Sequence, residues 1–254
     1  MIQYLINRFK ILFCVAILFG SCSSSGETDI PPPISTDRII EFSGYEWIVR
    51  TSNDNKVGPG PNYFSDSEDN VWVDDDGRLH LKIVRIGGTW YCSGVILKKP
   101  LGYGKYVFYV GNDVSKLDPN IVAGLFTYFN DEEEIDIEFS RWSDPDNEDS
   151  QFAVQPSHLV GNKVRYNLDL LTEYSTHSFN WQPDRIEFVS LQGHGLVVNG
   201  DNLIQEWTYH GDNIPPNRTA ERLRMNLWLF RGQVPSDSKT YEMIIDKFEF
   251  IKEN

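Results

Sequence analysis

The sequence has few cysteines and a deficit of basic residues, and each shortage excludes a class of protein. Three cysteines in 254 residues are too few for the disulfide framework of a small secreted scaffold. The chain carries 23 Lys and Arg against 37 Asp and Glu, a formal net charge of −14. We therefore expect no nucleic-acid partner, because binding to a phosphate backbone depends on clustered Lys and Arg.

Long apolar runs are also missing. The one continuous run near the N-terminus, Ile11–Phe19, has nine residues, whereas a membrane-spanning helix needs about 20. It follows two basic residues and precedes Gly20-Ser21-Cys22, an order that resembles a bacterial lipoprotein signal. The sequence thus predicts a secretory signal over residues 1–21 and lipidation of Cys22. Ordinary cleavage near Ser21 without a lipid is the alternative.

The segment after the signal is short of residues that could form a core. Residues 22–36 are rich in serine and contain three consecutive prolines, so they predict a tether. Once the signal is removed and Cys22 is lipidated, Cys92 is the last thiol, and no disulfide can form within the folded part. We expect a protein of a bacterial cell envelope, either an outer-membrane lipoprotein or a periplasmic or secreted protein. It would meet the membrane only through its lipid anchor.

The sequence also lacks helical periodicity. No long stretch flanked by helix-capping residues repeats apolar residues every 3.6 positions. Alternation with a period of two dominates instead, for example in 79–84, 106–110 and 241–246, with turn residues every 8–12 positions. This pattern predicts one all-β domain over residues 37–254, built as an antiparallel sandwich or barrel.

The most informative segment is 131–139, Asp-Glu-Glu-Glu-Ile-Asp-Ile-Glu-Phe. As a strand it places Glu134, Asp136 and Glu138 on one face and the apolar residues between them on the other. One interpretation is a solvated acidic face, and another is a calcium site, although a straight strand cannot wrap six oxygens around one ion. Retaining glycoside hydrolysis, which needs two carboxyl groups about 5–5.5 Å apart, is the interpretation we favour because the neighbouring segments are rich in aromatics.

The segment Glu-Ile-Asp-Ile-Glu-Phe also resembles the signature of glycoside hydrolase family 16, in the form without an extra residue before the last Glu. Supporting motifs follow in the order of bacterial lichenases over roughly residues 60–250: Gly102–Tyr106, Ile121–Tyr128, Gln151-Phe152, His177–Pro183 and Met225–Trp228. The resemblance implies a curved, concanavalin-like jelly roll with a substrate groove on its concave sheet.

The resemblance also implies a role for each matching residue. Glu134 matches the nucleophile, Asp136 the assisting carboxylate and Glu138 the acid/base. Trp228 matches an aromatic that stacks on a sugar ring, and Gln151 matches a polar groove residue near the catalytic centre.

Three further residues are weaker candidates. Tyr63, after the Gly- and Pro-rich loop 58–62, is expected at a groove edge unless that loop is only a rigid turn. Trp142 is expected to stack on a sugar unless it anchors a loop. Asp246 lies in the last predicted strand, where members of the family often hold a structural calcium. No other cofactor is expected, and the five histidines lack the spacing of a zinc site.

The chain departs from lichenases at positions that contact the sugar. Ala153, Gly94 and Ile96 replace polar or aromatic contacts, and Cys92 lacks its disulfide partner. We therefore expect a monomeric, retaining, endo-acting glycosidase on a β-linked polysaccharide such as a β-glucan. The substrate should be neutral, because the surface is acidic. A catalytically weak glycan-binding lipoprotein and a transglycosylase are the alternatives.

Overall fold

The computed structural model describes residues 37–252, so the signal, Cys22 and the tether lie outside the described residues. Strands make up nearly all of the regular secondary structure in this part of the chain, as the alternation predicted. The described strands are β1 (Ile39–Phe42), β2 (Tyr45–Val49), β3 (Tyr63–Phe64), β4 (Val71–Val73), β5 (Leu79–Ile86), β6 (Thr89–Leu97), β7 (Gly104–Val110), β8 (Ile121–Asn130), β9 (Glu133–Phe139), β10 (Ser150–Val154), β11 (Lys163–Tyr166), β12 (Ser175–Trp181), β13 (Ile186–Gln192), β14 (Leu203–Tyr209), β15 (Arg222–Leu229) and β16 (Tyr241–Ile251). Two short 3-10 helices, Val114–Lys116 and Phe230–Gly232, are the only helices within 37–252.

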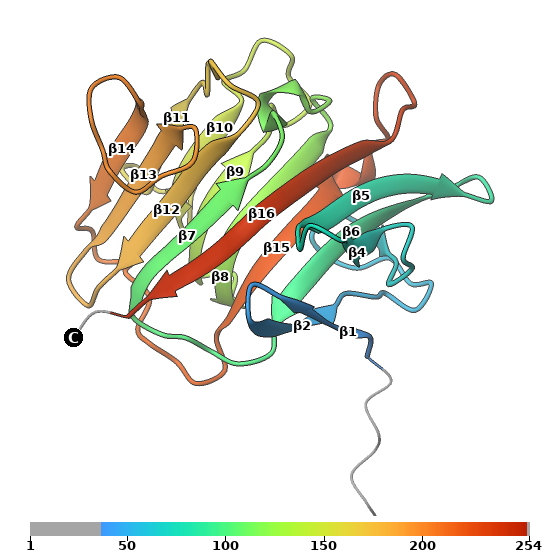
Figure 1. Ribbon diagram of the computed structural model, residues 1–254, viewed down its shortest axis with the longest axis horizontal. Helices are drawn as coiled ribbons and strands as arrows, with labels where there is room; N and C mark the ends of the chain where they lie inside the picture. Colours follow the sequence, from blue (N-terminus) through green and yellow to red (C-terminus); the bar gives the residue numbers. More distant parts are fainter. Residues whose placement is uncertain (1–36, 253–254) are drawn as a thin grey trace, which may run out of the picture. The chain divides into compact units, whose positions relative to one another are not determined.

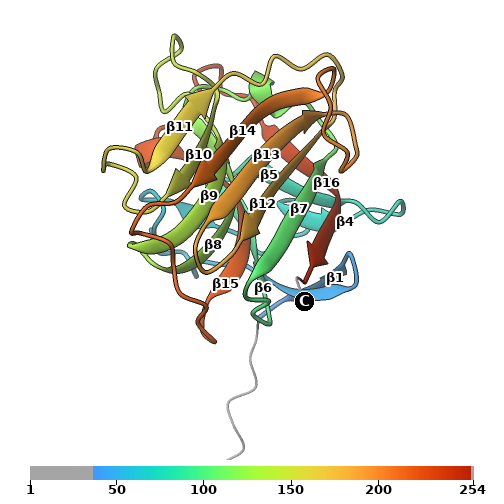
Figure 2. The same ribbon diagram turned by 90° about the vertical axis from the view of Figure 1, so that its left-hand side faces the viewer.

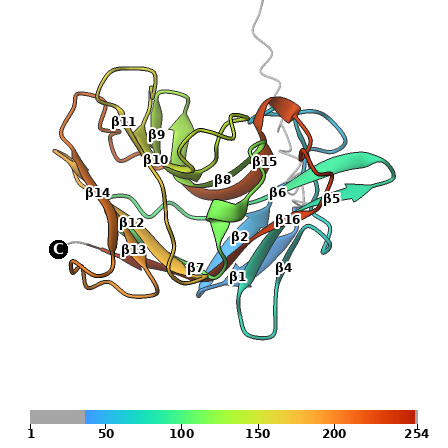
Figure 3. The ribbon, with the colours of Figure 1, turned by 90° about the horizontal axis from the view of Figure 1, so that it is seen from above.

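The strands form two packed layers that share one path of hydrogen bonds. The order along that path is β11-β10-β9-β8-β15-β6-β5-β16-β7-β12-β13-β14, with β1 and β2 attached to β6 (Figure 1). The pairings are antiparallel except that of β3 with β6. Figure 2 separates the layers, with β8–β11 on the left and β7, β12 and β16 on the right. The sheet is strongly curved, which confirms the predicted jelly-roll class (Figure 3).

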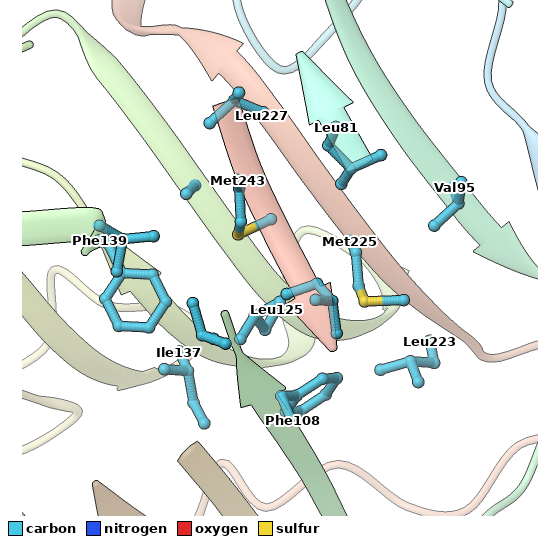
Figure 4. Close-up of a cluster of buried hydrophobic side chains, with 14 of the residues drawn as sticks. Leu81, Val95, Phe108, Leu125, Ile137, Phe139, Leu223, Met225, Leu227 and Met243 are labelled. Carbon is cyan, nitrogen blue, oxygen red and sulfur yellow. The ribbon is translucent and has the colours of Figure 1, made fainter. Parts of the chain in front are cut away.

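The core lies between the two layers and explains the alternation. The odd positions of β9 (Ile135, Ile137 and Phe139) are fully buried. Figure 4 shows Ile137 and Phe139 beside side chains of β8 and β15, facing Phe108 of β7 and Met243 of β16. Because successive side chains of a strand point to opposite faces, burying these three turns the even positions of β9 to the outer face.

Strand β9 has a partner on each edge. It pairs with β8, where Glu138 lies opposite Gly124, and with β10, where Glu138 lies opposite Gln151. The carboxylate strand therefore occupies an interior position in the sheet.

Cys92 and Trp181 are both fully buried in the core. Cys92 is a buried free thiol, and burial raises its pKa to about 12. Trp181 is fully buried, and its Nε1 donates a hydrogen bond to the Pro215 carbonyl at 3.0 Å, which fits a structural role. Over residues 37–252, no helix is long and apolar enough to span a membrane.

Candidate active site

The three even carboxyls of β9 lie in a row on the outer face of the sheet, as the alternation predicted. Asp136 is the central and most buried of them, with 2% of its surface exposed. Two glutamines hold the row from the side of β10. Gln151 Nε2 donates to Glu138 Oε2 at 2.7 Å, and Gln155 Nε2 donates to Asp136 Oδ2 at 2.9 Å.

Burial raises the pKa of each carboxyl of the row, and their mutual repulsion adds to the effect. The pKa of Asp136 rises well above its usual range, because the group is buried and lies beside Glu134. Burial raises the pKa of Glu134 to about 8, and a hydrogen bond with Asp136 and the positive charge of Arg224 offset only part of that rise. The row thus favours the neutral form of Asp136, which can donate a hydrogen bond to Glu134.

The pKa of Glu138 is shifted in the same direction. Burial, and then the charge of Asp136, raise the pKa of Glu138 to about 8, although the Gln151 hydrogen bond lowers it. At neutral pH the Glu138 carboxyl is therefore mainly protonated. The pKa values of Glu134 and Glu138 both lie near 8, so the row can supply a protonated carboxyl as general acid and, from its ionised fraction, a carboxylate nucleophile.

Glu134 and Glu138 open into a cleft of about 380 Å³. Its other lining residues come from β8, β15 and two loops, and they are Gly58, Pro59, Phe126, Tyr128, Asp131, Arg224, Asn226 and Trp228. The structure thus brings Trp228, which was predicted to stack on a sugar, into the same cleft as the two glutamates.

Two predicted sugar contacts lie elsewhere. Tyr63 lines a separate recess with Lys56 and Trp90, because pairing of β3 with β6 packs its ring 5.9 Å from that of Tyr91. The preceding loop does form a wall of the cleft, but through Gly58 and Pro59. Tyr63 is thus not among the residues that line the cleft of the catalytic row, and its contact with sugar stays a prediction.

Trp142 is the second of these. It follows β9 in a left-handed backbone conformation (φ +49°), and its ring lies under the guanidinium of Arg165, 4.1 Å from the ring centre. Arg165 lies opposite Gln151 in the β10–β11 pairing. Trp142 therefore supports the edge of the sheet next to Gln151 and is not among the residues that line the cleft.

Sequence reasoning missed Arg224, Asn226 and Tyr128. The signal was present, because residues 222–228 read Arg-Leu-Arg-Met-Asn-Leu-Trp, a strict alternation that ends at Trp228. A strand that presents Trp228 on one face must also present Asn226 and Arg224 there. Tyr128 required knowledge of sheet order, since β8 pairs with the distant β15.

Asp246 was predicted to bind a structural calcium. Its Oδ1 atom is buried and has no hydrogen-bond partner, and a Cβ on Gly111 would lie 2.1 Å from it. A buried carboxylate oxygen without a donor fits a calcium ligand. No group of three or more His, Cys, Asp or Glu in the described part of the chain could hold a metal, so the remaining ligands would have to be carbonyls or water. Calcium binding stays a prediction.

Comparison with solved structures identifies the architecture. The β-glucanase of Bacillus licheniformis aligns with a TM-score of 0.58 at 21% identity, over 82% of this chain and 92% of that one. A β-1,3-1,4-glucanase (lichenase) from a mouse hindgut metagenome aligns with a TM-score of 0.56 at 20% identity, over 80% and 92% of the two chains. The fold is that of the lichenase-type β-glucanases.

The same fold also occurs in a protein described as a pseudo β-1,3-glucanase of Mycobacterium tuberculosis. It aligns with a TM-score of 0.58 at 18% identity, over 82% of this chain and 91% of that one. No protein-family model matches the sequence, and no curated protein matches it. At these identities the similarity shows the fold, and the function must be argued from the side chains of the cleft.

Proposed function

We propose that the chain is a retaining, endo-acting glycoside hydrolase of family 16 that cleaves β-glycosidic bonds in a polysaccharide such as a β-glucan. One observation carries the proposal. Glu134 and Glu138 of β9 face the same cleft, and Asp136 between them is buried and in contact with Glu134. Endo action is proposed because β9 lies inside the sheet, with strands on both sides that a sugar chain can cross.

In the first step, the Glu134 carboxylate attacks the anomeric carbon and Glu138 donates its proton to the leaving glycosidic oxygen. Because Gln151 Nε2 donates a hydrogen bond to Oε2 of Glu138, Oε1 is the oxygen that can carry the proton. In the second step, the Glu138 carboxylate removes a proton from water, which attacks the glycosyl-enzyme and releases Glu134. Asp136 keeps the nucleophile oriented through its hydrogen bond.

The test is replacement of the nucleophile by its amide. Glu134→Gln should lower turnover on the order of 10⁴-fold or more, because no glycosyl-enzyme can form, while oligosaccharide binding persists. Glu133→Gln is the matched control, since Glu133 is the preceding residue and pairs with Arg218 at the surface. NMR of the first anomer released would show retention. Inversion, or activity of Glu134→Gln close to wild type, would overturn the assignment.

A glycan-binding protein without efficient catalysis is the second candidate. The observation that favours it is that the residue of β6 opposite Asn226 is Gly94, which has no polar side chain to contact a sugar. A Cβ on Gly94 would lie 2.3 Å from Asn226 Oδ1, so the amide occupies the space of a missing side chain. Binding without release of reducing ends on mixed-linkage glucan, laminarin, xyloglucan and agar would favour this candidate. Elongated products in the presence of an acceptor sugar would favour a transglycosylase.

We also propose that Cys22 is lipidated and anchors the domain at the cell envelope through the tether 22–36. The support is the run of small residues before Cys22 and the Ser- and Pro-rich segment after it. Wild-type protein expressed in a Gram-negative host should partition with membranes and incorporate labelled palmitate. Cys22→Ala should do neither, and equal labelling of both would contradict the proposal.

A further inference from the structure

Arg224 lines the β15 end of the cleft, and Arg50 lies close enough for the two charges to interact. Arg224 projects from the same face of β15 as Asn226 and Trp228, and all three line the cleft. Arg50 follows β2, and its guanidinium lies over the ring of Phe64, 3.8 Å from the ring centre. When the Asn226 amide is oriented to donate to the backbone, its oxygen accepts a hydrogen bond from Arg50 Nη1 at 3.1 Å.

The two guanidinium groups differ in how many of their hydrogen-bond donors have an acceptor. Arg50 has the Asn226 amide oxygen and also donates to the Gly58 carbonyl. Arg224 has no hydrogen bond or ion pair with any residue that the structure describes, and its buried Nε has no acceptor. Its one close partner is the ring of Tyr128, 4.2 Å from the guanidinium carbon.

Arg224 interacts electrostatically with Glu134, but the nearby acids do not accept hydrogen bonds from Arg224. Asp131 also lines the cleft, but its Oδ1 accepts a hydrogen bond from the Tyr128 hydroxyl at 2.8 Å. Glu134 already accepts the hydrogen bond of Asp136. The donors of Arg224 are therefore left for a ligand in the cleft.

The pair is also electrostatically unfavourable without a ligand. Burial and the charge of Arg224 lower the pKa of Arg50 to about 10, which shows that the two charges interact. Like charges in a partly buried site repel, and an anion between them offsets both the repulsion and the missing hydrogen bonds. A chain with 23 basic and 37 acidic residues does not place two arginines at one cleft through a generally basic surface.

We propose that Arg224, supported by Arg50, binds an anionic substituent, a sulfate ester or a carboxylate, on a sugar at the β15 end of the cleft. A guanidinium suits either group because its donors form a planar fork that can bind two oxygens at once. The inference rests on the proposed glycosidase function and deepens it by naming an acidic polysaccharide as the substrate. It replaces the neutral substrate expected from net charge, which describes the whole surface and not this cleft.

One glucan in three forms tests the inference. Mixed-linkage β-glucan is used unmodified, as its sulfated derivative, and oxidised at C6 to the uronate, and kcat/KM is measured for each. The variant is Arg224→Gln. The matched control is Arg85→Gln, which removes one positive charge from an exposed residue of β5 that donates to the Gly88 carbonyl.

Wild-type protein should prefer one acidic form to the neutral glucan, and the form preferred identifies sulfate or carboxylate as the ligand group. Arg224→Gln should reduce the ratio of acidic to neutral kcat/KM by about 10- to 100-fold, the value of a hydrogen-bonded ion pair. Arg85→Gln should leave the ratio unchanged. The inference would be overturned if wild-type protein cleaved the neutral glucan as well as or better than the acidic forms and Arg224→Gln lowered kcat/KM equally on all three forms. Arg224 would then act only through the charge of Glu134.

A binding arm separates failure of the inference from failure of the proposed function. Glu134→Gln is titrated with oligosaccharides of the three forms, with and without Arg224→Gln. Preferential binding of an acidic form that is lost in the double variant supports the anion site even if no form is hydrolysed. Binding with no preference among the three forms would overturn it even if hydrolysis is observed.

Discussion

Replacement of Glu138 by Gln should stabilise the fold at neutral pH while removing activity. The pKa of Glu138 is raised from an ordinary value of 4.5 to about 8 in the folded chain. Below pH 4.5 the carboxyl is neutral in both states and its contribution to stability is fully present. As the pH rises from 4.5 towards 8, the unfolded chain ionises Glu138 first, and this contribution is lost.

The magnitude follows from the pH interval. At pH 7 the difference 7 − 4.5 is 2.5 pH units, and at about 1.4 kcal/mol per unit the ionisable carboxyl costs about 3 kcal/mol. Part of this cost belongs to the coupled carboxyl of Asp136. We therefore expect Glu138→Gln to raise the free energy of unfolding by about 1–3 kcal/mol. For a domain of this size, that gain raises Tm by roughly 3–10 °C. The amide oxygen can still accept from Gln151 Nε2, so the local contact is kept.

The assay is thermal and urea unfolding of both proteins at pH 7 and at pH 4. Glu138→Gln should be more stable than wild type at pH 7, and the difference should disappear at pH 4. Glu249→Gln is the control, since its pairing with Lys247 lowers the pKa of Glu249, and its removal should cost stability at pH 7. Equal stability of Glu138→Gln and wild type at pH 7, or the same gain at both pH values, would refute the reasoning.

Two further predictions concern Gln151 and Asp246. Gln151→Leu removes the hydrogen bond that favours ionised Glu138, so the pKa of Glu138 should rise and the alkaline limb of the kcat/KM profile should move to higher pH. Hydrolysis of the glycosyl-enzyme should also slow, because it needs the Glu138 carboxylate. An alkaline limb at the same pH as in wild type would contradict the prediction. Calcium should raise the Tm of wild type and not that of Asp246→Asn, because Asp246 offers an unpartnered buried oxygen; no shift in wild type would argue against a calcium site.

Local alternation was sufficient to predict the carboxylate row. Glu134, Asp136 and Glu138 share a face by the geometry of any strand, and the buried positions between them turn that face outward. The same rule applied to 222–228 would have identified Arg224. What it cannot supply is sheet order, and therefore which distant strand lies beside β9.

Tyr63 illustrates that limit. In the sequence it follows directly after the loop that walls the cleft, yet pairing of β3 with β6 places it in another recess. Net charge has a similar limit, because a sum over the chain holds no information on where single charges lie. Arg224 lines the cleft of a chain whose net charge is −14.

The pairing of β9 on both edges has a consequence for how the groove can change over time. The β9 amides are bonded into β8 and β10, so they should exchange with solvent only when the whole domain opens. The wall formed by Gly58 and Pro59 belongs to the loop between β2 and β3, which is closed by an isolated bridge between Val57 and Asn62 and lies outside the paired strands. Selection for a different sugar can therefore remodel the wall and leave the reacting carboxyls in place.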